Sequence, residues 1–278
     1  MRIPAIPDHE MLGVIGRGGY GEIWLARSLT GALRAVKVVY RDTFESERAF
    51  NREFEGMSSF EPISRAHDGF VDILHVGRSV SGGFFYYVME LADDQVSGAE
   101  IEITRYAPKT LKAELGHTLP AAECLRIGLL LVDALDALHR RGLTHRDIKP
   151  SNIIFVQGAP KLADIGLVAA SGQQSFVGTE GYVPPEGPGT PQADIYSLGK
   201  VLYEISMGKD RLDFPELSSN LDERETRSGC CSSMKFSSKR ARIGPPSATK
   251  TRTKCGAIWP GSRRGKRCDA VRARCYRS

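Results

Sequence analysis

The chain has 278 residues, 41% of them hydrophobic and 26% charged, and its formal net charge is +5 at pH 7. This is enough apolar content for one large domain or two lobes with a substantial core. The N-terminus lacks the apolar segment of a signal peptide, and the longest apolar stretch, near residues 127–135, is interrupted by Asp133 and too short for a bilayer. With six cysteines, these features predict a cytoplasmic protein with reduced thiols and no membrane span.

The first predicted element is a strand, a turn and a second strand around a glycine cluster. Residues 15–23 read Ile-Gly-Arg-Gly-Gly-Tyr-Gly-Glu-Ile, which is the pattern G-x-G-x-x-G between apolar residues. In dinucleotide-binding folds a helix follows such a pattern, whereas here residues 22–26 continue as a strand. Glycines let backbone N–H groups approach phosphate oxygens because no Cβ intervenes. The segment predicts a phosphate-binding turn, with an ordinary hairpin as the alternative.

A buried strand with a single charge is predicted at residues 35–39, Ala-Val-Lys-Val-Val. Burying an unpaired ammonium group is costly. Lys37 therefore either faces solvent on an edge strand or pairs with a carboxylate and phosphates.

The helix predicted over residues 45–57 offers Glu53 and Glu55 as candidate partners for Lys37. Its apolar stripe is formed by Phe50, Phe54 and Met57. Glu53 lies within this stripe, whereas Glu55 points to the far side of the helix. We therefore predict that Glu53 is the partner of Lys37.

A third strand is predicted at residues 85–92 and is followed by an acidic link, residues 93–105, that contains Gly and Ser. No role for this link can be read from its residues. Apolar residues then recur with helical spacing from residue 120 to residue 138, until Gly142 ends the helix.

The loop after this helix carries the most informative motif. Residues 145–152 read His-Arg-Asp-Ile-Lys-Pro-Ser-Asn, which sets a potential proton acceptor, Asp147, five residues before a potential metal ligand, Asn152. Seventeen residues after Asp147, in the segment Lys-Leu-Ala-Asp-Ile-Gly-Leu, Asp164 is a second candidate metal ligand. A lone His-Arg-Asp would mean little, but the neighbouring motifs make the pattern specific.

Two further motifs follow: Gly-Thr-Glu-Gly-Tyr-Val-Pro-Pro-Glu at residues 178–186 and Ala-Asp-Ile-Tyr-Ser-Leu-Gly at residues 193–199. Each motif occurs once, and their order is that of protein kinases. Residues 9 to about 215 thus resemble a bacterial-type, or Hanks-type, serine/threonine protein kinase domain.

The resemblance implies an α+β, bilobal fold with a β-rich N-lobe and hinge over residues 9–92 and a helical C-lobe over residues 93–220. It also implies a serine/threonine protein kinase that transfers the γ-phosphoryl group of ATP, with Mg²⁺, to Ser or Thr hydroxyls of protein substrates. The implied catalytic residues are Asp147 as the base, with Lys149 and Thr179 shaping the site for an aliphatic hydroxyl. Asn152 and Asp164 would bind Mg²⁺.

Further roles follow from the resemblance alone. The ion pair between Lys37 and Glu53 would position the phosphates. The remaining residues implied to contact the nucleotide are Ile15, Gly16, Gly18, Gly21, Ile23, Ala35, Glu90, Ala92 and Ile154. Asp194 would brace the catalytic loop through its backbone, and Arg146 could pair with a phosphate added by autophosphorylation at Ser171 or Ser175.

The tail, residues 221–278, differs from the rest of the chain. Residues 227–278 carry 15 Lys and Arg residues and a single acidic residue, Asp269, which gives a net charge of +14. The first 226 residues carry 23 Lys and Arg residues and 32 Asp and Glu residues, which gives a net charge of −9. Five of the six cysteines also lie there, and no Leu follows Leu221. Such a segment has too little aliphatic content to bury a core.

Three explanations of the tail compete. It could be a disordered basic extension that binds nucleic acid, acidic partners or a membrane surface. A Cys-based metal module is disfavoured, because no C-x-x-C pair occurs and no His follows His145. The abrupt change in composition favours an out-of-frame translation, and nucleic-acid binding is correspondingly disfavoured.

Kinases of this family continue past residue 220 with several more C-lobe helices, one of which brings an Arg to the Glu of the P-P-E motif. Glu186 is therefore expected to lack its partner, and the C-lobe to be incomplete. The alternatives to an active kinase are an inactive truncated or pseudokinase-like module that binds nucleotide or partners, and a nucleic-acid binder acting through the tail.

Overall fold

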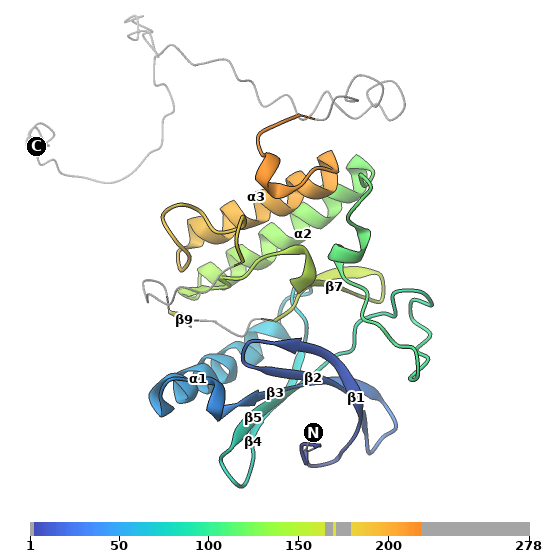
Figure 1. Ribbon diagram of the computed structural model, residues 1–278, viewed down its shortest axis with the longest axis vertical. Helices are drawn as coiled ribbons and strands as arrows, with labels where there is room; N and C mark the ends of the chain where they lie inside the picture. Colours follow the sequence, from blue (N-terminus) through green and yellow to red (C-terminus); the bar gives the residue numbers. More distant parts are fainter. Residues whose placement is uncertain (1–2, 165–168, 171–178, 218–278) are drawn as a thin grey trace, which may run out of the picture. The chain divides into compact units, whose positions relative to one another are not determined.

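The computed structural model of the protein describes residues 3–164, 169–170 and 179–217. The predicted tail and the predicted phosphorylation sites Ser171 and Ser175 lie outside these residues. An N-terminal antiparallel sheet with one helix is followed by a mainly helical part, which is the α+β architecture expected from the sequence (Figure 1). The predicted incompleteness of the C-lobe stays a prediction.

The N-lobe is built on a five-stranded sheet with the strand order β1-β2-β3-β5-β4. Its strands are β1 (His9–Gly18), β2 (Gly21–Ser28), β3 (Leu33–Tyr40), β4 (Ile73–Arg78) and β5 (Phe84–Met89). Strand β3 has a neighbour on each side, and Lys37 is only 7% exposed. An edge-strand position for Lys37 is therefore excluded, so its ammonium group needs a partner inside the protein.

Helix α1 (Glu47–Ser64) packs on one face of this sheet after the short helix η1 (Arg41–Thr43). It begins at Ser46, whose hydroxyl accepts a hydrogen bond from the Ala49 N–H at 3.2 Å, the usual N-cap arrangement. The rings of Phe50 and Phe54 lie 5.2 and 5.6 Å from the ring of Phe85 on β5. The apolar stripe predicted for this helix thus faces the sheet.

The C-lobe is organised by α2 (Ala121–His139) and α3 (Pro191–Met207), which lie side by side (Figure 1). The predicted apolar positions of α2, including Ile127, Leu131 and Leu135, are fully buried. Thr190 caps α3, and Gly208 ends it with a left-handed φ of 66° that suits glycine. Two short helices, η2 (Leu111–Glu114) and η4 (Arg211–Asp213), flank this pair in the sequence.

Short strands position the loop between the two helices. Strand β6 (Leu143–Thr144) pairs with β9 (Ala169–Ala170), and β7 (Ile153–Val156) pairs with β8 (Ala159–Leu162). The catalytic loop, residues 145–152, runs from β6 to β7 and ends in the short helix η3 (Pro150–Asn152). In the part of the chain that the structure describes, no helix has the length and apolar character needed to span a membrane.

Candidate active site

Three polar side chains singled out in the sequence, Lys149, Asn152 and Thr179, converge on Asp147. Its carboxylate accepts a hydrogen bond from the Thr179 hydroxyl at 3.0 Å and forms an ion pair with the Lys149 ammonium at 2.7 Å. Lys149 also donates to the Thr179 hydroxyl at 2.9 Å, and the Asn152 amide donates to the Asp147 carboxylate at 2.9 Å. The structure therefore brings Thr179 to two residues of the catalytic loop, Lys149 and Asp147, which precede it by 30 and 32 positions.

These contacts determine the charge of Asp147. Burial by itself would raise the pKa of this carboxyl group, but hydrogen bonds and charge from Lys149, with further hydrogen bonds from Thr179 and Asn152, outweigh it and lower the pKa. Asp147 is consequently ionised at neutral pH and can accept a hydrogen bond or a proton.

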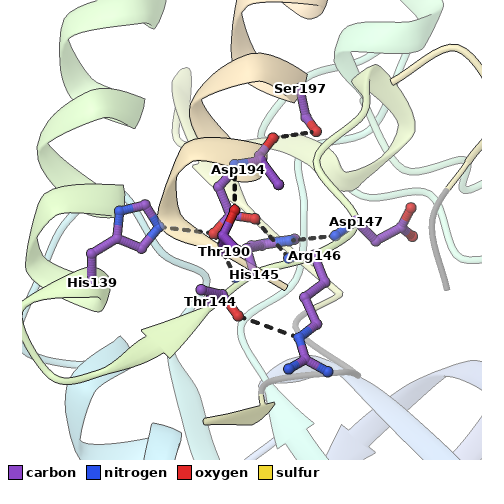
Figure 2. Close-up of polar contacts among 9 residues, drawn as sticks. His139, Thr144, His145, Arg146, Asp147, Thr190, Asp194 and Ser197 are labelled. Carbon is purple, nitrogen blue, oxygen red and sulfur yellow. Dashed lines mark hydrogen bonds and ion pairs between the residues drawn. The ribbon is translucent and has the colours of Figure 1, made fainter. Parts of the chain in front are cut away.

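A buried carboxylate on α3 holds the backbone of the loop (Figure 2). Asp194 is 1% exposed and accepts hydrogen bonds of 2.8 Å from the N–H groups of both His145 and Arg146. It also contacts the His139 ring nitrogen Nε2 at 2.8 Å. Arg146 has a left-handed φ of 70°, unusual for a residue with a side chain, and the contact with Asp194 stabilises that conformation. Asp194 thus acts as the brace expected from the sequence.

A cavity of about 360 Å³ lies between the glycine turn and the catalytic loop. It is lined by eight of the residues predicted to contact a nucleotide: Ile15, Gly16, Gly18, Ile23, Ala35, Glu90, Ala92 and Ile154. Lys149, Asn152 and Asp164 also line it. Apolar walls with a few polar groups at one end suit a ligand that has a flat ring and a charged portion.

Comparison with known proteins agrees with this geometry. Residues 9–263, most of the chain, match the protein kinase domain family. The chain belongs to this family. It is 31% identical over 214 residues to the DNA damage-responsive serine/threonine-protein kinase RqkA of Deinococcus radiodurans, and 30% identical over 222 residues to the serine/threonine-protein kinase PrkC of Bacillus subtilis.

The matched segments cover 72% and 74% of this kinase chain but only 30% and 31% of RqkA and PrkC. The chain therefore spans less than a third of the length of these relatives. The family match runs to residue 263, past the boundary near residue 220 that the composition suggested, so that boundary stays a prediction.

The donor set of the kinase cavity fits a magnesium ion. The Asp164 carboxylate and the Asn152 amide both line it, and oxygen atoms are the ligands that Mg²⁺ prefers. Within the described ranges no group of three or more His, Cys, Asp or Glu side chains could hold a metal ion by itself. Two protein ligands supplemented by phosphate oxygens are the usual arrangement for Mg²⁺ in phosphotransferases.

The predicted ion pair between Lys37 and Glu53 does not form in this structure, in which Lys37 pairs with Asp164. Burial raises the pKa of Glu53 to about 8, although Lys37 opposes the shift, so Glu53 is mainly protonated at neutral pH. A neutral carboxyl group attracts the ammonium only weakly, whereas the Asp164 carboxylate contacts it directly. Burial also lowers the pKa of Lys37 to about 8, with Glu53 and Asp147 opposing that shift.

The choice of Glu53 over Glu55 agrees with the structure. Glu53 is half-buried and close enough to Lys37 for its charge to raise the pKa of the lysine, whereas Glu55 is exposed. Helical periodicity therefore identified the side of α1 that faces the site, but not the ion pair that forms there.

Two glycines of the turn, Gly18 and Gly21, differ in their environment. A Cβ atom on Gly21 would overlap the carbonyl oxygen of Val38 on the neighbouring strand, and Gly21 is not among the residues that line the cavity. A Cβ atom on Gly18 would meet no atom within 4 Å. Close packing of β2 on β3 thus requires glycine at residue 21, while Gly18 borders open space beside the cavity.

The segment that directly follows the link of residues 93–105 contributes a cavity wall that the sequence did not reveal. Tyr106 lines the cavity, and its hydroxyl donates to the Ala92 carbonyl at 3.0 Å. The Asp94 carboxylate joins the start of this link to the segment after it, because it accepts hydrogen bonds from the N–H groups of Val96 and Ala107, each at 2.9 Å. The cavity is completed by other residues not singled out beforehand: Arg17, Met89, Pro108, Thr110, Ser151 and Ala163.

A polar contact joins the hinge to the C-lobe. Lys161 on β8 forms an ion pair with Glu90 at 2.5 Å, and the Glu90 carboxylate accepts a hydrogen bond from the Asp72 N–H at 2.9 Å. Glu90 also lines the cavity, so this contact holds the part of the backbone expected to meet the purine. No sequence motif indicated it, because the two residues are 71 positions apart.

Proposed function

We propose that this protein is a serine/threonine protein kinase that transfers the γ-phosphoryl group of ATP to hydroxyl groups of protein substrates. The observation that carries the proposal is the cluster of Asp147, Lys149 and Thr179 beside the nucleotide-sized cavity. The names of RqkA and PrkC, both serine/threonine-protein kinases, support the same substrate class.

In the proposed reaction, Asp147 orients the substrate hydroxyl and accepts its proton. The hydroxyl oxygen forms a bond to the γ-phosphorus, the bond between that phosphorus and the bridging oxygen breaks, and ADP leaves with the electron pair. Lys149 pairs with Asp147 and lines the cavity, where its charge would stabilise negative charge on the transferred group. Thr179 holds both side chains in this arrangement through its hydroxyl.

Asn152 and Asp164 are the residues that would hold Mg²⁺, which when bound supplies charge neutralisation on the phosphates. Lys37, next to Asp164, would bind phosphate oxygens. The hinge backbone at Glu90 and Ala92 would contact the purine, between Ile15, Ile23 and Ala35 on one side and Ile154 on the other. We also propose a cytoplasmic location and autophosphorylation at Ser171 or Ser175, with Arg146 as the partner of the phosphate.

The test is transfer of radiolabelled phosphate from ATP to a generic Ser- and Thr-containing protein. Asp147→Asn should lower kcat by about 10²-fold or more, because it removes the proton acceptor while keeping the side-chain shape. Asp136→Asn is the matched control, since Asp136 lies on the exposed side of α2, where it pairs with Arg140. Wild-type protein that binds ATP but transfers no phosphate would overturn the proposal and favour the inactive, nucleotide-binding alternative.

A further inference from the structure

The hydroxyl of Tyr87 is buried in the N-lobe without a hydrogen-bond partner among the described residues. Tyr87 lies on β5 and is 2% exposed. Most buried hydroxyl groups in proteins are hydrogen-bonded, and phenylalanine would fill the same space at no such cost. The presence of tyrosine here calls for a function of its hydroxyl group.

The position of Tyr87 points to the phosphate-binding lysine. Tyr87 and Lys37 are directly opposite each other in the pairing of β5 with β3, and the Lys37 ammonium lies 5.9 Å from the centre of the Tyr87 ring. The neighbouring side chain, Tyr86, belongs to the cluster on the other face of the sheet. Among the two adjacent tyrosines, Tyr87 is therefore the one that shares a face with Lys37.

Helix α1 brings a third group to the same place. Glu53 lies between Phe50 and Phe54 on the helix, and both of these rings pack against Phe85, two residues from Tyr87 on the same face of β5. The charge of Glu53 also raises the pKa of Tyr87, second to burial, as expected for a carboxyl group on the side of α1 that packs against β5. Tyr87 and Glu53 nevertheless form no hydrogen bond in this structure, in which Lys37 pairs with Asp164.

We propose that Tyr87 is a positioning residue for Glu53: its hydroxyl donates a hydrogen bond to the Glu53 carboxylate when that carboxylate pairs with Lys37. The inference rests on the proposed kinase function and deepens it. In that arrangement Asp164 is released from Lys37 toward the metal, and the hydrogen bond from Tyr87 stabilises the charged form of a carboxyl group that burial disfavours. The Tyr87 hydroxyl is then unpaired while Lys37 pairs with Asp164, and it gains its partner when Lys37 pairs with Glu53.

The test uses Tyr87→Phe, with Tyr86→Phe on the opposite face of the same strand as its matched control. Because Tyr87→Phe removes only an unpaired hydroxyl, its melting temperature should equal or exceed that of the wild type. Its kcat/KM for ATP should nevertheless fall about 3- to 10-fold, the range expected for one hydrogen bond. Tyr86→Phe should leave kcat/KM unchanged.

A double-mutant cycle shows whether the effect runs through Glu53. In the Glu53→Gln background, Tyr87→Phe should change kcat/KM by less than about twofold, because the charged acceptor is already gone. An equal loss in both backgrounds would contradict the proposal, as would unchanged kcat/KM in Tyr87→Phe. A fall in both melting temperature and kcat/KM would assign the hydroxyl a structural role and contradict it too. Tyr87→Met, a second apolar replacement, should show the same loss of kcat/KM.

Nucleotide affinity separates this inference from the proposed function. Absence of phosphate transfer by the wild type would reject the proposed function, but calorimetric titration with ATP and Mg²⁺ still tests Tyr87 in that case. The Kd of Tyr87→Phe should exceed that of the wild type by about 3- to 10-fold, because Lys37 would be less well placed for the phosphates. Equal Kd values would reject the role of Tyr87 whatever the catalytic activity.

Discussion

Asp194 on α3 and Arg146 on the catalytic loop are joined by a 2.8 Å hydrogen bond from the Arg146 N–H to the Asp194 carboxylate. A second bond of the same length comes from the His145 N–H. These contacts hold the catalytic loop in a backbone conformation that is strained at Arg146. Helix α3 therefore controls the position of Asp147, although it contributes no side chain to the cavity.

Asp194→Ala should therefore destabilise the protein and reduce its activity. The replacement leaves two buried N–H groups unpaired, and each costs about 1–3 kcal/mol, a large part of the roughly 5–15 kcal/mol that stabilises a typical domain. Urea unfolding followed by circular dichroism measures the loss. The exposed Asp136→Ala on α2 is the control, and equal unfolding free energies for the two variants would contradict the role of Asp194.

The hydroxyl of Thr179 is predicted to matter more than its methyl group. Thr179→Ala removes the bonds to Asp147 and Lys149, so kcat should fall about tenfold, with little change in KM for ATP. Thr179→Ser retains the hydroxyl and should recover most of the activity. Steady-state kinetics with a peptide substrate measure kcat for both variants. Equal kcat values for Thr179→Ala and Thr179→Ser would show that the hydrogen bonds of the hydroxyl do not contribute to catalysis.

Two glycines of the turn should respond differently to the same change. Gly21→Ala forces a Cβ atom onto the Val38 carbonyl and should cost about 3 kcal/mol or more of unfolding free energy. Gly18→Ala meets open space and should change stability by less than about 1 kcal/mol, with any effect seen in ATP affinity. Thermal unfolding and ATP titration of both variants provide the comparison. Equal loss of stability would disagree with the structure.

The contact between Lys161 and Glu90 should support nucleotide binding. Lys161→Met leaves the half-buried Glu90 carboxylate without its ammonium partner, so stability should fall by about 1–3 kcal/mol and KM for ATP should rise. Lys209→Met breaks the more exposed ion pair with Glu216 and should leave stability nearly unchanged. An unchanged KM for ATP in Lys161→Met would show that the hinge does not depend on this contact.

The raised pKa of Glu53 predicts a particular dependence of stability on pH. Burial raises this pKa from 4.5 to about 8, so the folded protein holds a proton that the unfolded chain has already lost. The contribution of Glu53 to stability is thus full below about pH 4.5 and declines as pH rises toward 8. Between pH 5.5 and 7.5 the wild type should lose up to about 2 kcal/mol relative to Glu53→Gln.

Urea unfolding of both proteins at the two pH values measures this difference. Comparing the two proteins cancels the titration of groups that they share, including the histidines. A constant difference between wild type and Glu53→Gln across this range would show that Glu53 is ionised in the folded protein at neutral pH.

Sequence alone determined the features that depend on local patterns. The order of the motifs indicated the family, and the spacing of Asp147, Lys149 and Asn152 on one short loop required those groups to lie close together. Helical periodicity separated Glu53 from Glu55, because side chains three or four positions apart share a face of a helix. The apolar positions of α2 followed from the same periodicity.

Only the tertiary structure decided which distant groups meet. Lys37 pairs with Asp164 rather than Glu53, because burial favours the neutral form of Glu53 while the Asp164 carboxylate reaches the ammonium. Tyr106 enters the cavity, and Gly21 is required by a neighbouring strand rather than by phosphate. Periodicity and motif spacing describe neighbours along the chain, whereas the partner of a buried charge depends on which side chains converge from separate elements and on how far burial shifts their ionisation.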